Sequence, residues 1–401
     1  MKIVHTSDWH LGQRFFGESR ETEHRAFLDW LVNIIDRDDI DALVISGDIF
    51  DIKNPPSYAK RLYNDFLAKT RETKCKNIII IGGNHDSSLV LDEQKKLLKP
   101  LKIFIVGGGA TKPEDTIFKI ERDNKLIGVI SAIAYLSETN LRDSKKSSEE
   151  RDRAKELENA IARYYKRAYR ASKRAIKNRN LPLIATGHLS TLRREHSESV
   201  RDIYIGKIEL FDKKRFPPFD YIALGHYHRR VVSKNIAYSG SPIILSFDEA
   251  KHKKYILEVD ISADNLNIKD IEVPKFRDLF TLEGDILDIE KRLKELKLNS
   301  PIKPAFVQLK LNPPKNLMHL NSKIDELTNL RKDIKILKVI VKKISDEIML
   351  DGLEDINRLE NISPEGLFLK RLEAEDFTKE AREKLLNRFI QIKNMVELDE
   401  N

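Results

Sequence analysis

The chain has 401 residues, which is too long for one ordinary hydrophobic core, so two or three domains are expected. Hydrophobic residues make up 40% of the chain and charged residues 34%, and the net charge is +8. No apolar run approaches the ~20 residues of a membrane span, and the single cysteine, Cys75, excludes an intrachain disulfide framework. We expect a cytoplasmic protein without a signal peptide, because a strand already begins at Lys2.

Residues 1–135 alternate between apolar runs of strand length and amphipathic stretches of helix length. Strands are predicted at about 2–6, 42–46, 78–81, 103–106, 116–120 and 126–133, and helices at about 20–36 and 57–72. Further short strands follow near 183–186, 221–224 and 255–261. Such alternation is typical of an α/β fold, in which helices cover a layered sheet.

Five of these apolar runs end in a glycine, a serine or a turn and then in side chains that bind metals. The most informative run holds four isoleucines at 78–81 and continues as Gly82-Gly83-Asn84-His85-Asp86. The other four lead into Asp8-x-His10, Gly47-Asp48-x-x-Asp51, Gly187-His188 and Gly225-His226-x-His228. Because ligands of open α/β sheets gather at the carboxyl ends of the strands, we expect these five loops to converge.

The candidate metal ligands are seven side chains: Asp8, His10, Asp48, Asn84, His188, His226 and His228. Carboxylates and imidazoles without thiols suit Mn²⁺, Fe²⁺ or Zn²⁺. Seven ligands are too many for one ion, but they suit two ions bridged by one carboxylate, for which Asp48 is the candidate. Two such ions support an in-line displacement at a phosphoryl group.

His85 directly follows a candidate ligand and is the candidate catalytic histidine. Its expected role is to protonate the leaving oxygen or to brace the phosphate as charge builds up. A catalytic histidine needs an orienting carboxylate, and Asp51 and Asp86 both lie close in the sequence. Of the other histidines, we expect His5 to pack or to form a hydrogen bond within its strand, and His24, His196 and His252 to lie on the surface.

Residues 138–180 interrupt the pattern with a long polar helix. Its stretch 161–180 carries eight Lys or Arg and no acid, which favours a polyanionic partner. Five of the cations share one helix face: Arg163, Arg167, Arg170, Arg174 and Lys177. Two interpretations stay open here, a solvated surface helix and a surface that follows a phosphate backbone.

The last third of the chain contains no candidate ligand set. Residues 279–345 predict a small α/β unit, with strands near 280–283, 305–311 and 335–342 and helices at 286–296 and 316–331, and residues 346–362 are typical of a linker. The tail from Ser363 predicts two helices with apolar stripes that include Leu367, Phe368, Leu372, Leu385, Leu386, Phe389 and Ile390. Two helices cannot bury both stripes by themselves, so a partner surface is favoured over packing on the same chain.

The order of the five motifs resembles the calcineurin-like metallophosphoesterases and, within them, the SbcD family of nuclease subunits. The match also includes residues 5–13, 19–24, 55–59, 200–206, 220–226 and 239–249. The resemblance implies a four-layer α/β sandwich, two sheets flanked by helices. It implies that Asp8, His10, Asp48 and His228 hold one ion, and that Asp48, Asn84, His188 and His226 hold the other. It further implies that His85 is the catalytic residue that binds no metal and that Asp51 pairs with it.

By the same resemblance, residues 1–275 form the nuclease domain, 276–345 a capping domain that shapes DNA access, and 363–401 a helix pair that docks on the coiled coil of an SbcC-type ATPase. The chain has no Gly-x-x-x-x-Gly-Lys-Ser/Thr loop of its own, so ATP would act only through that partner. The family implies a heterotetramer with two copies of each subunit. It also implies a homodimer through helices near 57–100, with an apolar seam expected from Tyr58, Leu62, Phe66, Leu97 and Leu98.

We therefore expect a Mn²⁺-dependent DNA nuclease, with Mg²⁺ as the other candidate ion, that is associated with the nucleoid when it is on DNA. It would be an exonuclease on duplex ends and an endonuclease on single strands or hairpins. Archaeal and eukaryotic relatives have a histidine where this chain has Asp51. The balance between their exonuclease and endonuclease activities is therefore a poor guide to this chain. Two other functions stay open: a phosphodiesterase or phosphatase acting on small molecules or phosphoproteins, and a DNA-end tether whose metal site is dispensable.

Overall fold

The computed structural model describes residues 1–37, 39–108, 112–141, 150–177, 179–191, 211–262, 265–312, 320–341, 385–386 and 388–389. The chain divides into two compact units, Met1–Lys343 and Ile344–Asn401. The predicted linker 346–362 lies outside the described residues, as do Leu367, Phe368, Leu372, Ile390 and His196. No helix within the described ranges is both long and apolar enough to cross a membrane.

The first sheet has six strands in the order β14-β13-β1-β4-β5-β6. The bounds are β1 Lys2–Thr6, β4 Ala42–Ser46, β5 Asn77–Ile81, β6 Ile103–Val106, β13 Tyr255–Ile261 and β14 Leu266–Glu272. β1, β4, β5 and β6 run parallel, and β13 joins β1 antiparallel. All residues of β4 and β5 are buried, as expected for apolar runs covered on both faces.

The second sheet also has six strands, in the order β11-β12-β10-β9-β8-β7. The bounds are β7 Ile117–Arg122, β8 Lys125–Ser131, β9 Leu183–His188, β10 Tyr221–Gly225, β11 Val231–Ser233 and β12 Ile236–Tyr238. β8, β9, β10 and β12 are mutually parallel, and β7 and β11 close the two edges antiparallel. Candidate ligands therefore follow strands of both sheets.

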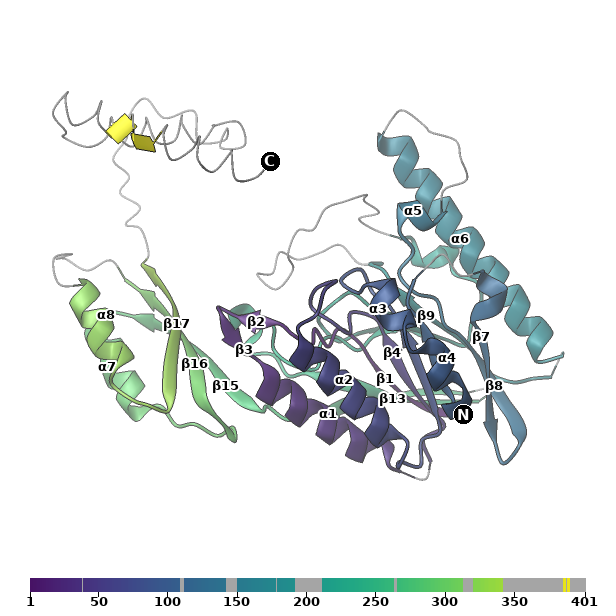
Figure 1. The fold of residues 1–401 in the computed structure, drawn as a ribbon, viewed down its shortest axis with the longest axis horizontal. Helices are drawn as coiled ribbons and strands as arrows, with labels where there is room; N and C mark the ends of the chain where they lie inside the picture. The colour runs from purple at the N-terminus through teal and green to yellow at the C-terminus, as the bar shows by residue number, and fades with distance from the viewer. Residues whose placement is uncertain are drawn as a thin grey trace. The chain divides into compact units, whose positions relative to one another are not determined.

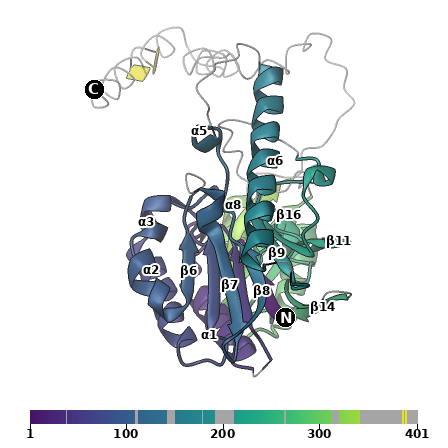
Figure 2. The ribbon, with the colours of Figure 1, turned by 90° about the vertical axis from the view of Figure 1, so that its right-hand side faces the viewer.

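The two sheets pack face to face, and helices cover their outer faces (Figures 1 and 2). Alternate residues of the strands, such as Ile79 and Ile184, form the core between the sheets. The helices α1 (Glu21–Ile35) and α2 (Ser57–Thr70) cover the first sheet, and α6 (Glu150–Ala175) covers the second. This arrangement confirms the predicted four-layer α/β sandwich, which we call the sandwich.

The sequence led us to expect a polar helix in this region. The structure shows that one side of α6 is apolar and forms part of the core. Tyr164 and Tyr165 are buried against the second sheet, and the Tyr165 hydroxyl donates to the Thr186 carbonyl at 3.0 Å. Figure 2 shows α6 alongside β7, β8 and β9. The expected helix from 138 is seen as α5 (Glu138–Leu141) followed by α6, and residues 142–149 lie outside the described ranges.

A small three-stranded sheet follows the sandwich, and we call it the three-stranded unit. Its elements are β15 Arg277–Gly284, α7 Ile286–Glu295, β16 Ile302–Leu311, α8 Leu320–Thr328 and β17 Ile334–Val341. All three strands are parallel, with α7 and α8 as the crossovers. Leu293, Val307 and Leu309 form a core cluster within it, and its separation from residues 1–275 as a domain of its own stays a prediction.

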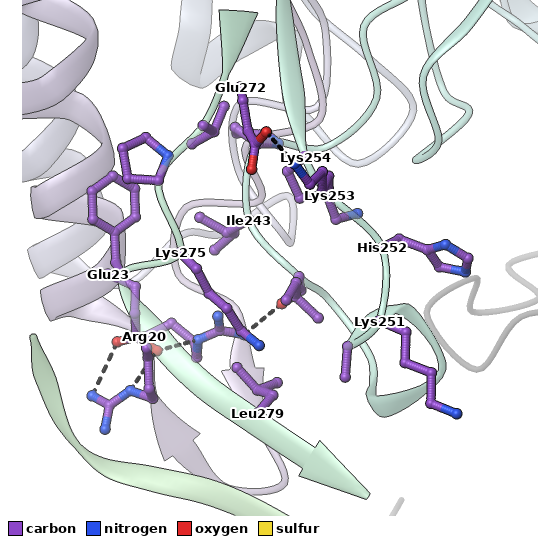
Figure 3. Close-up of a pocket in the computed structure, with 17 residues that line it drawn as sticks. Arg20, Glu23, Ile243, Lys251, His252, Lys253, Lys254, Glu272, Lys275 and Leu279 are labelled. Atoms are coloured by element: carbon purple, nitrogen blue, oxygen red, sulfur yellow. Dashed lines mark hydrogen bonds and ion pairs between the residues drawn. The ribbon is translucent and has the colours of Figure 1, made fainter. Parts of the chain in front are cut away.

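The three-stranded unit contacts the sandwich through a buried ionic cluster and an aromatic stack. Glu23 of α1 accepts from Arg20 Nε at 2.6 Å and from Arg277 Nε at 2.8 Å, and both oxygens of Glu23 are used (Figure 3). Phe15 of the hairpin β2 (Arg14–Phe15) and β3 (Glu18–Ser19) stacks on Phe306 at 5.9 Å. A cavity of about 240 Å³ opens at this junction.

The short helices α3 (Ser88–Asp92) and α4 (Lys95–Leu98) lie beside β6. The expected apolar seam on the helices near 57–100 is largely wrong. Leu62, Phe66 and Leu98 are buried in the chain's own core, because they are on the side of their helices that faces the first sheet. Leu97 is 74% exposed, and Leu89, which the sequence reasoning did not single out, is 84% exposed.

The Glu23→Gln substitution is expected to destabilise the fold by about 3–5 kcal/mol, because it leaves two buried arginines without their counter-charge. The two arginines outweigh the effect of burial and lower the pKa of Glu23 to about 2, from an ordinary value of 4.5. The stabilisation is therefore complete above about pH 4.5 and is lost as the pH falls towards 2. Urea unfolding between about pH 4.5 and pH 2 measures this loss in the free energy of unfolding. The variant should show a flatter acid dependence, and the exposed-pair control Glu290→Gln should behave like wild type.

Candidate metal centre

The candidate ligands lie where the carboxyl ends of the two sheets meet. Asp8 and His10 follow β1, Asp48 follows β4, and Asn84 follows β5, all in the first sheet. His188 ends β9, and His226 and His228 follow β10, in the second sheet. All seven predicted ligands are thus brought to one edge of the sandwich.

The backbone of this edge is held in unusual conformations. Four of the candidate ligands have a positive φ although they are not glycines: Asp8 at 54°, His10 at 47°, Asp48 at 51° and His226 at 92°. Such conformations cost free energy and are concentrated at functional sites, where the surrounding structure enforces them. The strain therefore marks these loops as a binding site rather than as ordinary turns.

Two glycines allow the loops to approach one another. Gly47 has a φ of 89°, and a Cβ there would lie 2.4 Å from His188 Nδ1. A Cβ on Gly83 would lie 2.1 Å from Asp48 Oδ1. Both distances are far below van der Waals contact, so any larger residue would push Asp48 and His188 out of position.

One cluster of ligand atoms is formed by Asp48, Asn84, His188 and His226. His188 Nε2 lies 3.2 Å from Asp48 Oδ2 and 3.0 Å from Asn84 Oδ1. His226 Nδ1 lies 2.9 Å from the same Asn84 oxygen. Ligand atoms of Asp48, His188 and His226 all lie within 4.8 Å of one another, which is close enough to surround a single ion.

The second cluster is formed by Asp8, His10 and His228, whose ligand atoms also lie within 4.8 Å of one another. His10 Nε2 is 3.3 Å from His228 Nε2 and 3.8 Å from Asp48 Oδ2. Asp48 thus lies beside both clusters. Asp8 is itself fixed by the Ser7 hydroxyl and by the backbone N–H of His226, which donates to Asp8 Oδ1 at 2.9 Å.

The family assignment agrees with this geometry. The Calcineurin-like phosphoesterase family model matches residues 1–230. The chain is 34% identical over 393 residues to the D subunit of the nuclease SbcCD from Escherichia coli K12, covering 97% of both chains. It is 31% identical over 268 residues to the corresponding SbcCD polypeptide of Bacillus subtilis (65% of this chain, 66% of that one) and 32% over 275 residues to that of Rhodobacter capsulatus (65% and 67%).

This chain belongs to the SbcD family of calcineurin-like phosphoesterases. Among solved structures, a dimetal phosphatase from Danio rerio aligns over 68% of this chain and 96% of that one, at 12% identity and a TM-score of 0.37. That score is too low for a residue-by-residue comparison. As in the family, the present chain is a phosphoesterase, and its ligand clusters are suited to divalent metal ions.

The protonation of the SbcD-family site also fits a cation. Burial by itself would lower the pKa of His188, but the adjacent Asp48 raises it to about 9. Burial would raise the pKa of Asp48, yet His188, His85 and His10 hold it well below its usual range. In the second cluster, burial lowers the pKa of His228 to about 4, so its ring is neutral at pH 7. Without an ion, a proton on His188 therefore supplies the positive charge beside Asp48 that a bound divalent ion would supply.

His85 lies at the edge of the site and is half-buried. Its Nδ1 is 2.8 Å from the backbone carbonyl of Asp51, to which an Nδ1–H donates, and its ring centre is 5.0 Å from that of His10. The partner observed for the ring is therefore a carbonyl of Asp51, whereas the sequence reasoning expected a carboxylate. The Asp51 carboxylate lies 3.2 Å from His10 Nδ1 instead.

Asp86 is buried between the loops that follow β4 and β5. Its carboxylate accepts the backbone N–H groups of Ile49, Phe50 and Gly83 at 2.8–3.1 Å. Burial and the nearby Asp48 raise its pKa to about 6. These contacts tie the loop after β4 to the loop after β5, so Asp86 supports the geometry of the site.

The expectation that His24 lies on the surface is wrong. It is fully buried in α1, and no described residue forms a hydrogen bond with either ring nitrogen. Burial lowers its pKa to about 3. His24 is three and four residues before the buried Phe27 and Leu28, so the helical period would have placed it on the inner face. His5 packs and lies 2.9 Å from the Tyr221 hydroxyl, and His252 is exposed, both as expected.

The predicted nucleic-acid-binding residues belong to α6 and its C-terminal end, and the described partner-binding residues belong to the second compact unit. Arg163, Arg167, Arg170, Arg174 and Lys177 are placed on the outer side of α6 and at its end. In the second compact unit, Leu385 is exposed, and Leu386 and Phe389 are half-buried. The roles of these residues stay predictions.

Mn²⁺ binding is expected to release protons and to tighten as the pH rises from 6 to about 9. The reason is that an ion must displace the proton that Asp48 holds on His188, whose pKa is raised to about 9. One released proton corresponds to up to about tenfold in affinity per pH unit. Isothermal titration calorimetry in buffers of different ionisation enthalpy counts the protons. Binding without proton release between pH 7 and 8 would contradict the expectation, and the surface variant His252→Gln should match wild type.

Proposed function

We propose that this chain is the catalytic subunit of a DNA nuclease that hydrolyses phosphodiesters at a two-metal site. The observation that carries the proposal is the meeting of seven ligand side chains in two adjacent clusters that share Asp48. The 34% identity to a bacterial nuclease subunit over 97% of both chains supports DNA as the substrate. Exonuclease action on duplex ends and endonuclease action on single strands or hairpins are the activities we propose.

The residues divide between the ions as the two clusters suggest. Asp8, His10 and His228 would hold one ion, and Asn84, His188 and His226 the other, with Asp48 shared. His188 presents Nε2 to the site because its Nδ1 faces the Ser46 carbonyl at 2.9 Å. Mixed oxygen and imidazole ligands suit Mn²⁺ better than Mg²⁺, which prefers oxygen, so Mn²⁺ is the proposed ion. When bound, two such ions supply Lewis acidity at the phosphoryl group and activate the attacking water.

His85 would handle the proton of the leaving group. The Asp51 carbonyl accepts from Nδ1–H, which fixes the ring plane and directs Nε2 away from that loop. In its protonated form the ring donates from Nε2 to the leaving oxygen or to a phosphoryl oxygen. The backbone N–H of His85 donates to Asp48 Oδ1 at 3.0 Å, so the acid and the shared ligand are held together.

An SbcC-type ATPase is the proposed partner, because the similar bacterial proteins are named as subunits of SbcCD nucleases. The proposed docking element is the tail, with the apolar stripes of Leu367, Phe368, Leu372, Leu385, Leu386, Phe389 and Ile390. ATP would act through that partner. A homodimer is proposed through α3 and α4, where Leu89 and Leu97 expose apolar surface.

The exposed face of α6 is the proposed path of duplex DNA. Among the described residues, Arg167 pairs with Glu114 at 2.8 Å, while Arg163, Arg170 and Arg174 form no ion pair within 4 Å. The face begins close to Tyr165, which contacts Thr186 and Gly187, directly before the ligand His188. From Arg163 to Arg174 it extends about 11 residues along α6, or roughly 17 Å. A row of cations of this length matches several successive phosphates.

His85→Gln is expected to lower DNA cleavage by about 10²–10⁴-fold without changing metal stoichiometry, because His85 is not among the proposed ligands. The assay uses Mn²⁺ and a hairpin-ended duplex, with His252→Gln as the surface control. Equal rates for His85→Gln and wild type would refute the assignment of His85. A wild-type chain that hydrolyses cyclic nucleotides or phosphopeptides but no DNA would favour the small-molecule alternative, and one that binds duplex but cuts nothing would favour the tether.

Neutralising Arg163, Arg167, Arg170 and Arg174 to Gln is expected to weaken duplex binding and to flatten its dependence on salt, by about one unit of log–log slope for each phosphate that is no longer neutralised. Fluorescence anisotropy at several salt concentrations measures both the affinity for duplex DNA and its dependence on salt. The matched control neutralises four exposed cations around α2: Lys60, Arg61, Lys69 and Arg71. A slope equal to wild type would leave α6 as a solvated surface helix.

A further inference from the structure

A buried pair of opposite charges lies behind the candidate ligand His228. Glu249 ends the short 3₁₀ helix Phe247–Glu249, and Lys254 directly precedes β13. Glu249 is 2% and Lys254 is 7% exposed, and their Oε2 and Nζ atoms are 2.7 Å apart. Charged side chains are rarely buried to this degree unless they serve a structural or functional requirement.

Both members of the pair contact His228. Glu249 Oε1 lies 3.9 Å from His228 Nδ1, and Lys254 Nζ donates to the His228 carbonyl at 3.3 Å. Lys254 also donates to the Ser241 hydroxyl at 2.8 Å, and the Ser241 backbone N–H donates to the same carbonyl at 3.1 Å. The ring and the backbone of His228 are therefore both held from this side.

The direction of the His228 ring makes these contacts informative. Its Nε2 is 3.3 Å from His10 Nε2, within the ligand cluster, so Nδ1 is the nitrogen that faces Glu249. Histidines that bind metals generally direct their second nitrogen to a carboxylate or carbonyl, which fixes the tautomer and makes the ligand nitrogen more basic. The separation of 3.9 Å exceeds a hydrogen bond, so the carboxylate acts on the ring through its charge.

We propose that Glu249 is a positioning residue that orients His228 for metal binding, and that Lys254 fixes the Glu249 carboxylate in place. The inference rests on the two-metal function proposed above and deepens it. It assigns to Glu249 a role at only one of the two ions, the one held by Asp8, His10 and His228.

The two oxygens of the Glu249 carboxylate have different partners, which supports this role. Oε2 accepts from Lys254 and from the backbone N–H of Leu245 at 3.0 Å, whereas Oε1 is the oxygen nearer to His228. Lys254 lines the cavity at the junction with the three-stranded unit (Figure 3). A purely structural pair would stabilise this loop and the junction without affecting one ion more than the other.

The test measures Mn²⁺ stoichiometry and affinity by calorimetry on the full chain, for wild type and Glu249→Gln. We expect wild type to bind two ions, and the variant to bind one of them about 10–100-fold more weakly while the other is unchanged. Lys254→Arg, which keeps the positive charge, should remain near wild type. The matched control is Glu272→Gln, which breaks the exposed Glu272–Lys253 pair of the same 2.7 Å length.

If Glu249→Gln binds both ions as wild type does, or weakens both equally with a lower melting temperature, the positioning role is wrong. Should Glu249→Gln fail to fold, Glu249→Asp withdraws the carboxylate from Nδ1 while it keeps the charge. Selective weakening of one ion in Glu249→Asp supports the inference, and unchanged binding of both overturns it. A wild-type chain that binds no Mn²⁺ at all would instead refute the proposed two-metal function.

Discussion

The contact between Asp48 and His188 is the constraint on which the site depends. The two residues belong to different sheets, yet His188 Nε2 and Asp48 Oδ2 are 3.2 Å apart. The carboxyl ends of the sheets must therefore touch, and the Ser46 hydroxyl, which donates to the Ala223 carbonyl at 3.0 Å, joins them beside the site. Gly47 and Gly83 are required at the same place because no side chain would fit. A sandwich with a thicker layer here would separate the ligands of the two clusters.

Features that are local in the chain could be predicted from the sequence. The runs at 2–6, 42–46 and 78–81 are short and mostly apolar, and each leads directly into ligand side chains, so both the strand and the site residue could be predicted together. The pairing of strands could not be predicted in this way. β13 lies beside β1 although about 250 residues separate them, and only the family resemblance indicated two sheets. Periodicity carries no information about such distant partners.

Buried polar residues were the main failure of sequence reasoning, and the reason is physical. Glu23 and Arg20 are buried because Arg277, 254 residues beyond Glu23, completes their cluster. Asp86 is adjacent to the catalytic candidate, but three backbone N–H groups occupy its carboxylate. In both cases partners that are distant in sequence help to decide the role: Arg277 for Glu23, and the backbone of Ile49 and Phe50 for Asp86. His24 is different, since its spacing from Phe27 and Leu28 already indicated burial.

The segment between Gly240 and Lys254 links the metal centre to the junction with the three-stranded unit. At one end, Glu249 and Lys254 contact His228, and at the other, the Ile244 carbonyl accepts from Arg20 at 2.8 Å. Arg20 in turn shares Glu23 with Arg277, the first residue of β15. The Leu245 N–H, which donates to Glu249 at 3.0 Å, connects the two ends, and most groups in this series are buried, so that partial separation of their contacts is costly. The contacts of Arg277 at the start of the three-stranded unit are therefore continuous with the contacts that hold His228.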